Sequence, residues 1–214
     1  MYKKGRVYGV GINDADYKVH RYELIDGELK QVWVCRYYRT WTGMLQRCYS
    51  EKYLKKKPSY DGSSVCEEWL LFSAFRKWMV EQDWEEIDAD GKPTGVTKQL
   101  DKDVLSGSRR GKLYCPETCV FVSQAVNLFL TSSKASRGDL PIGVQASPYG
   151  DKFLAKVSNL RGKQEHLGTF LTVKAAHRAY IKRKTELAVR LASEQTDPRV
   201  AAALLNIDWS ETDA

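Results

Sequence analysis

The most constraining feature of this 214-residue chain is the pattern of residues 141–192. Apolar and polar residues alternate along its middle part, which places Phe153, Ala155 and Val157 on one face of an extended segment. Glycine, proline and asparagine occur at the ends of the extended segments, where turns need them. Three strands are therefore predicted over residues 141–147, 152–158 and 164–170.

A helix is predicted directly after the third strand. Thr172 is suited to cap its first turn, because a threonine oxygen accepts a hydrogen bond from a free backbone N–H group. Four apolar residues then recur at helical spacing and face the sheet: Ala175, Ala176, Ala179 and Tyr180. The module is therefore expected to be a three-stranded sheet with one helix packed on it.

Charge is distributed unevenly along the chain. Residues 141–192 carry 10 basic and 3 acidic side chains, and residues 1–60 carry 13 and 6. The segment between residues 61 and 103 and the tail, residues 193–214, are acidic. The basic balance, with a pI near 9.1, favours a polyanionic partner. For residues 1–60, an ordinary charged surface is an equally good interpretation.

The C-terminal module resembles the AP2-type DNA-binding domain. Four groups of residues carry the resemblance: Gly143-Val144, Phe153-x-Ala155, Leu167-Gly168-Thr169-Phe170 and Thr172-x-x-x-Ala176-x-x-Ala179-Tyr180. The resemblance implies that the sheet enters the major groove of double-stranded DNA, which admits strands as well as helices. The side chains that face away from the helix would then contact bases and phosphates.

Carried over by position, this face consists of seven residues: Gln145, Ser147, Tyr149, Lys156, Ser158, Gln164 and His166. Four basic residues are expected to contact phosphates: Lys152, Lys156, Arg161 and Lys163. Plant AP2 domains have arginine and tryptophan at many of these positions, so the base contacts of this chain must differ. A glutamine can pair with adenine. The alternative is that the basic sheet is only a soluble surface.

The N-terminal part is predicted to contain two amphipathic helices. Over residues 37–53 the apolar stripe is Trp41, Met44, Leu45 and Cys48, and over residues 66–80 it is Trp69, Phe72, Phe75 and Met79. Residues 6–12 and 29–36 are expected to be extended, residues 84–98 to be a polar loop, and residues 198–209 a short extra helix. The fold class is therefore α+β, with domains at residues 1–130 and 140–192, a linker at 131–139 and an acidic tail at 193–214.

Residues 37–130 resemble the HNH-type homing endonucleases of phages. The resemblance rests on Tyr38-x-x-Trp41-x-x-Met44-Leu45-x-Arg47-Cys48-Tyr49, Val65-Cys66-x-x-Trp69-x-x-Phe72-x-x-Phe75, Leu100-Asp101-Lys102-Asp103 and Tyr114-x-Pro116-Glu117-x-Cys119-x-Phe121-Val122-x-x-x-x-Asn127. It implies a ββα-metal-like core, in which a histidine activates water and a divalent cation offsets the charge that develops on phosphorus. The two resemblances together predict a degenerate HNH-like domain joined to an AP2-like domain.

The catalytic histidine of that family falls on Lys102, and a charged lysine cannot act as a general base. The three histidines, His20, His166 and His177, all lie elsewhere in the sequence. The catalytic candidates that remain are Asp101, Asp103 and Asn127, with Asp101 and Asp103 as ligands for Mg²⁺ if cleavage occurs. In the alternative interpretation the two aspartates shape a turn and Asn127 satisfies backbone groups.

Zinc is not expected, because the chain offers one loose cysteine pair, Cys115 and Cys119, while Cys48 and Cys66 lie on apolar stripes. An odd number of cysteines, 5, and the lack of an apolar run of membrane-spanning length predict a reduced, cytoplasmic protein. If the gene is carried by a phage, as the resemblance implies, this is the cytoplasm of the bacterial host.

Three functions are compatible with the sequence. The first is a double-stranded DNA-binding protein of the phage HNH/AP2 homing-endonuclease type with weakened or lost cleavage. The second is an active Mg²⁺-dependent DNA endonuclease. The third is an inhibitor or regulator that uses the nuclease scaffold to bind a protein partner.

Overall fold

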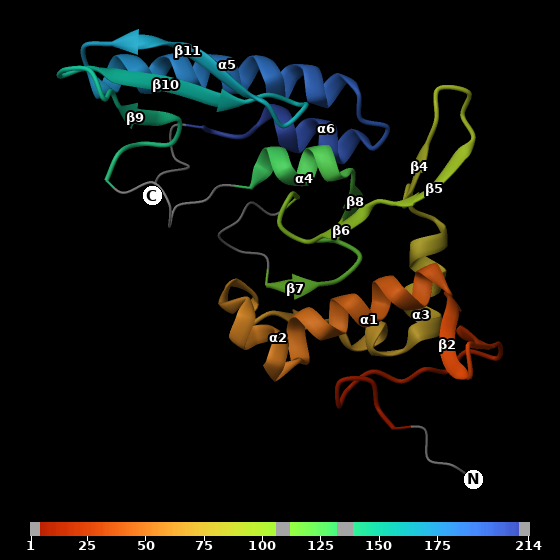
Figure 1. The fold of residues 1–214 in the computed structure, drawn as a ribbon. Helices are drawn as coiled ribbons and strands as arrows, with labels where there is room; N and C mark the ends of the chain where they lie inside the picture. The colour runs from red at the N-terminus through yellow and green to blue at the C-terminus, as the bar shows by residue number, and fades with distance from the viewer. Residues whose placement is uncertain (1–4, 106–111, 132–138, 210–214) are drawn as a thin grey trace. The chain divides into compact units, whose positions relative to one another are not determined.

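The computed structural model describes residues 5–105, 112–131 and 139–209 (Figure 1). It is a mixed α+β structure with several small sheets, as the fold class predicted. The chain divides into two compact units, residues 1–121 and 122–214. The expected linker lies outside the described residues except for Thr131 and Asp139.

The first predicted helix is two helices, α1 (Arg36–Tyr49) and α2 (Glu51–Lys56). Ser50 separates them with an extended backbone (φ −88°, ψ 108°), and its hydroxyl accepts a hydrogen bond from Tyr53 N at 3.3 Å. A serine hydroxyl that caps a new helix competes with continuation of the preceding one, so the single helix expected over residues 37–53 is wrong.

The second predicted helix is also divided. A 3₁₀ turn, η2 (Glu67–Leu70), is followed by extended Leu71 (φ −87°, ψ 127°) and by α3 (Phe72–Val80). Ile12 causes the break, because its N–H donates to Leu70 O at 2.8 Å and its carbonyl accepts from Phe72 N at 3.1 Å. The segment 6–12, expected to be extended, folds instead into a turn in which Val7 pairs with Gly11.

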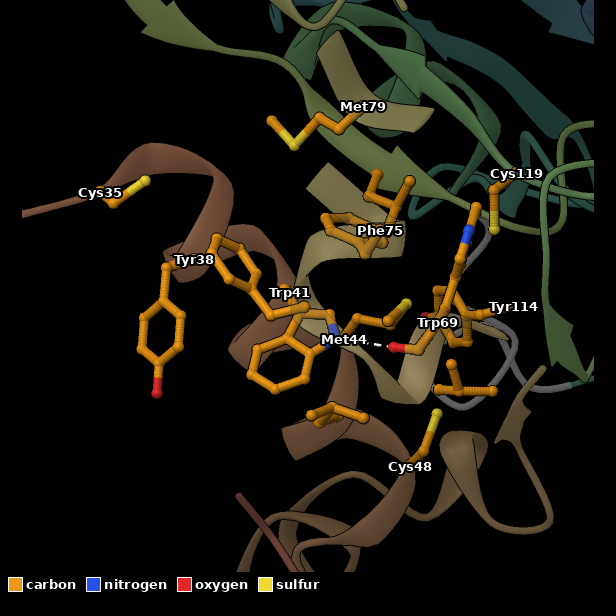
Figure 2. Close-up of a cluster of buried hydrophobic side chains, with 14 of the residues drawn as sticks. Cys35, Tyr38, Trp41, Met44, Cys48, Trp69, Phe75, Met79, Tyr114 and Cys119 are labelled. Carbon is orange, nitrogen blue, oxygen red and sulfur yellow. Dashed lines mark hydrogen bonds between the residues drawn. The ribbon is translucent and has the colours of Figure 1, made fainter. Parts of the chain in front are cut away.

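The helices of the N-terminal unit enclose an aromatic core (Figure 2). The predicted stripes are confirmed: Trp41, Met44, Leu45, Trp69, Phe72, Phe75 and Met79 are 0% exposed, and Cys48 is 6% exposed. Trp41 Nε1 donates to Trp69 O at 2.7 Å, which satisfies the buried indole and ties α1 to η2. The core therefore binds the two helical segments through packing and one buried hydrogen bond.

Besides the C-terminal sheet, the described residues form four pairs of strands. The hairpin β1 (His20–Ile25) and β2 (Glu28–Val34) confirms the extended segment expected at 29–36 as far as Val34, whereas Arg36 already belongs to α1. Elsewhere β3 (Ser64–Val65) is parallel to β7 (Leu113–Tyr114), β6 (Gln99–Asp101) pairs with β8 (Val120–Val122), and β4 (Glu85–Ile87) pairs with β5 (Pro93–Thr97).

The β4–β5 hairpin replaces the polar loop expected over residues 84–98. Asp88 forms the turn, because its Oδ1 accepts from Asp90 N and from Lys92 N, both at 2.9 Å. Gly91 supplies a positive φ of 76°. An aspartate and a glycine at these positions are typical turn residues, so the loop prediction overlooked a hairpin signal.

The C-terminal unit contains α4 (Gln124–Leu130), β9 (Val144–Ala146), β10 (Phe153–Ser158), β11 (Gln164–Phe170), α5 (Val173–Ser193) and α6 (Pro198–Leu205). The sheet is antiparallel in the order β11-β10-β9, and α5 covers one of its faces (Figure 1). Val144, Ala155 and Ala176 are buried between sheet and helix, and Thr172 Oγ1 accepts from Ala175 N at 3.2 Å. The predicted module and its cap are confirmed.

Lys184 connects α4 to α5 within this unit. Its ammonium group donates to Phe129 O at 2.6 Å and lies 3.6 Å from the centroid of the Phe129 ring. Trp209 contacts the same phenylalanine edge to face, with ring centroids 5.4 Å apart. The C-terminal unit is thus larger than the sheet and α5 alone.

Candidate nucleic-acid interface

The face of the sheet opposite α5 carries five of the predicted contact residues. Lys156 pairs with His166, and Ser158 pairs with Gln164, across β10 and β11. Gln145 lies opposite Leu154 on β9, and Lys156 Nζ donates to Gln145 Oε1 at 3.1 Å. Because paired residues of antiparallel strands share a face, these side chains form one polar surface.

The other predicted residues lie in the two connections at opposite ends of the sheet. In the β9–β10 connection, Ser147 Oγ accepts from Tyr149 N at 3.1 Å, and the Tyr149 side chain is 85% exposed. In the β10–β11 turn, Asn159 Oδ1 accepts from Arg161 N at 2.9 Å and from Lys163 N at 3.0 Å. Side-chain caps of this kind fix the backbone from which the exposed basic side chains project.

The polar surface contains no carboxylate from the strands. Glu165 is the single acidic residue of β9, β10 and β11, and it faces α5, where both its oxygens accept from Arg183 at 3.0 and 3.2 Å. Arg183 also donates to Glu186 at 2.9 Å, and these hydrogen bonds raise the pKa of Arg183. The acid is therefore neutralised on the helix side, while Lys156 and His166 remain on the outer side.

A hollow of about 720 Å³ borders the outer residues within the C-terminal unit. Gln145, Lys156, Ser158 and Gln164 line it, together with Leu128 of α4. The hollow therefore lies between residues of the sheet and residues of α4, next to the predicted contact residues.

One outer residue was missed by the sequence analysis. Thr169 pairs with Leu154 and is exposed, so it belongs to the outer surface. A β-bulge between Ala155 and Lys156 shifts the register by one residue, which moves Thr169 to the face that strict alternation would give to Gly168. Gly168 has a φ of 137°, a value that favours glycine. The glycine at this position is therefore a sequence signal of the bulge.

The predicted catalytic loop follows β6. Asp101 Oδ1 accepts from Asp103 N at 2.7 Å and from Val104 N at 2.9 Å, so this carboxylate shapes the turn. Lys102 is 6% exposed, its Nζ lies 2.6 Å from Asp103 Oδ1, and it lies 5.8 Å from the centroid of the Tyr114 ring. Burial raises the pKa of Asp103, against the opposing effect of the Lys102 hydrogen bond.

These groups do not fit a Mg²⁺ site as they are arranged. One carboxylate accepts two backbone N–H groups, and the other is paired with a buried ammonium group that would repel a cation. Asn127 lies on α4, in the other compact unit. Within residues 5–105, 112–131 and 139–209, no group of three or more His, Cys, Asp or Glu side chains is arranged to hold a metal. Metal binding by Asp101 and Asp103 stays a prediction that requires the Lys102–Asp103 pair to open.

The five cysteines are free thiols. Burial raises the pKa of Cys119 to about 12 and that of Cys48 to about 11. Both side chains belong to the hydrophobic core, where thiols behave as small apolar groups.

No helix among the described residues is both long enough and apolar enough to cross a membrane. Comparisons of the chain with protein-family models, with curated proteins and with solved structures find no match.

Proposed function

We propose that this protein binds double-stranded DNA through the outer face of the β9–β11 sheet, in the manner of an AP2-type domain. The observation that carries the proposal is the sorting of charge in the sheet, with Glu165 bound to Arg183 on the helix side and Lys156 and His166 on the outer side. The outer strand face, which has no carboxylate, can approach phosphates without repulsion, and the capped basic turn at Arg161 and Lys163 extends it, whereas the β9–β10 connection carries the exposed carboxylate of Asp151 beside Lys152.

The shape of the sheet supports the same partner. Three antiparallel strands backed by one helix present a narrow polar face, and the major groove of B-DNA, roughly 12 Å wide, admits strands of this kind. Gln145 and Gln164 can read base edges, and Lys156 can contact either a guanine or a phosphate. The glutamines of the strands are therefore expected to contact bases, and the basic residues in the turns at the ends of the sheet are expected to contact phosphates.

A substitution at the centre of the surface tests the proposal. Lys156→Gln removes the charge of the residue that binds Gln145, and should weaken affinity for a 30-base-pair duplex by about 1 kcal/mol or more at low salt. The matched control is Lys174→Gln, an exposed lysine of α5. Fluorescence anisotropy with the full chain measures both. Equal losses would show that binding is diffuse, and no binding by the wild-type chain would leave the protein-partner hypothesis.

We propose further that the N-terminal unit is an HNH-like scaffold whose cleavage is weakened or lost. The position of the catalytic histidine holds Lys102, which is buried and paired with Asp103. A general base must accept a proton, whereas the Lys102 ammonium group is the donor in its pair with Asp103. The Asp101 carboxylate shapes the turn, because its Oδ1 accepts from Asp103 N and Val104 N.

Plasmid nicking in the presence of Mg²⁺ or Mn²⁺ tests this second part. At equal DNA occupancy, the wild-type chain and Asp101→Asn should both nick slowly or not at all. Rapid nicking by the wild type that is lost in Asp101→Asn would instead establish the active endonuclease, and would show that the Lys102–Asp103 pair opens on DNA.

A further inference from the structure

The short helix α2 presents a basic face in the N-terminal unit. Lys52, Lys55 and Lys56 follow one another at i, i+3 and i+4, so they share one side of the helix, and all three are exposed. Tyr53 and Leu54, on the other side, are partly buried. With the exposed Lys57 that follows, these lysines form the α2 lysine cluster (Lys52, Lys55, Lys56 and Lys57).

No carboxylate is paired with this cluster in the part of the chain that the structure describes, although other lysines of the same unit have partners. Lys98 Nζ lies 2.6 Å from Asp83 Oδ2, and Lys30 Nζ lies 3.8 Å from Glu28 Oε2. Lysines at i and i+4 repel each other, and Lys52 lies in the first turn of α2, where the helix dipole disfavours a cation. Helix stability favours Lys55 and Lys56 near the C-terminal end but does not account for Lys52.

The cluster rests on a fixed support. Ser50 caps the start of α2, and the Tyr53 ring packs against Tyr60 with centroids 5.8 Å apart. Lys57 N donates to Tyr53 O at 2.9 Å, which closes the last turn before the 3₁₀ helix η1 (Pro58–Tyr60). The backbone that carries the four ammonium groups is therefore ordered before any partner binds.

We infer that the α2 lysine cluster is a second DNA contact, which binds the phosphates of duplex DNA without reading sequence. The inference rests on the proposed DNA binding and extends it to the N-terminal unit. Four exposed ammonium groups on one short segment outnumber its single carboxylate, Glu51 in the first turn of α2, and complement the regular negative charge of a duplex. Sequence would then be read by the sheet, and affinity would come in part from α2.

The test compares two variants of the full chain with equal net charge. One replaces the cluster (Lys52→Gln, Lys55→Gln, Lys56→Gln and Lys57→Gln), and the matched control replaces four exposed lysines elsewhere in the same unit (Lys18→Gln, Lys30→Gln, Lys77→Gln and Lys92→Gln). Anisotropy with a 30-base-pair duplex at 50 to 300 mM KCl gives the slope of log K against log salt. The cluster variant should lower the magnitude of this slope by about 2 to 4, and the control by less than about 1, because each phosphate contact contributes about 0.9.

The remaining outcomes separate the inference from the proposed function. Equal slopes for the two variants, with Lys156→Gln still weakened, would overturn the second contact and leave the sheet as the DNA site. No duplex binding by the wild-type chain would overturn both. Loss of binding to phosphatidylserine vesicles in the cluster variant, with an unchanged slope on DNA, would assign the cluster to an anionic membrane and overturn the inference. Thermal melting confirms that each variant is folded.

Discussion

Two lysines are buried among the described residues, and their surroundings differ. Lys102 is paired with the carboxylate of Asp103. Lys184, 7% exposed, has a backbone carbonyl and two aromatic rings around it, with its Nζ 4.9 Å from the centroid of Trp209. Burial lowers the pKa of Lys184 to about 8, because the charged form loses solvation that these neutral groups do not replace.

We therefore expect Lys184 to make stability depend on pH above neutrality. The unfolded chain binds the lysine proton up to a pH near 10.4, whereas the folded chain releases it near 8, so stability rises with pH between those values by about 1.4 kcal/mol per pH unit. Below pH 8 the full cost of the buried charge is present. Urea unfolding at pH 7, 8, 9 and 10 measures the difference in the free energy of unfolding between the wild type and Lys184→Met.

Other groups titrate in this range and affect both proteins alike, so the difference between wild type and variant isolates Lys184. That difference should change in favour of the wild type as the pH rises. A difference that is constant across the range would show that the Phe129 and Trp209 rings keep the ammonium group charged.

At the scale of elements, the junction of β9 with α5 depends on one glycine. Gly143 has a φ of 78°, and a Cβ atom built on it would lie 2.0 Å from Cδ2 of Tyr180. Gly143 O also accepts at 2.8 Å from the backbone N–H of Lys156, the residue at the centre of the proposed interface. The close approach of β9 to α5 therefore requires a residue without a side chain here.

We expect Gly143→Ala to destabilise the C-terminal unit by about 2 kcal/mol or more, since positive φ and a steric clash act together. Gly150→Ala is the control, because Gly150 has the same φ of 78° but nothing within 4 Å of an added Cβ. The free energy of unfolding of Gly150→Ala should be lower than that of the wild type by about 1 kcal/mol. Urea denaturation compares the two, and equal losses would mean that the Tyr180 ring moves aside freely.

The elements of the sheet and α5 could be predicted because each is determined by neighbouring residues. Alternation placed Phe153, Ala155 and Val157 correctly, and Thr172 marked the start of α5. The two breaks in the N-terminal helices could not be predicted in the same way. Leu71 is extended because distant Ile12 pairs with it, and no pattern within residues 66–80 reports that contact.

The candidate site was predicted in part, for similar reasons. Gln145, Lys156 and His166 share a face because alternation and turn positions set the register of short hairpins. The burial of Lys102 could not be foreseen, because a lysine in a charged tripeptide is normally exposed and its burial depends on Tyr114 from another strand.

At the scale of the whole molecule, α4 belongs to the compact unit that contains the proposed DNA interface. Phe129 supplies the carbonyl and the ring that surround Lys184, and it packs against Trp209. Removal of α4 would leave Lys184 without these partners and would expose the apolar surface beneath them. The stable form of the DNA-binding unit should therefore begin before α4.

We expect a fragment of residues 122–214 to be more stable than a fragment of residues 140–214. The free energy of unfolding of the shorter fragment should be lower by about 2 to 5 kcal/mol. This is the range for removal of a large buried aromatic side chain, and one buried hydrogen bond is removed with it. Circular dichroism during thermal melting of both fragments measures it. Identical melting temperatures would show that α4 contributes nothing to this unit.

The parallel pairing of β3 with β7 has a consequence for biosynthesis. Val65 pairs with Tyr114, and Tyr114, Cys119 and Phe121 complete the core whose first buried residue along the chain is Val19. At about 5 to 20 residues per second, a ribosome adds Phe121 roughly 6 to 24 s after the first residue. During that interval α1 and α3 have emerged without the strands that cover them. Chaperones that hold nascent chains should therefore engage this protein before Phe121 emerges and release it afterwards.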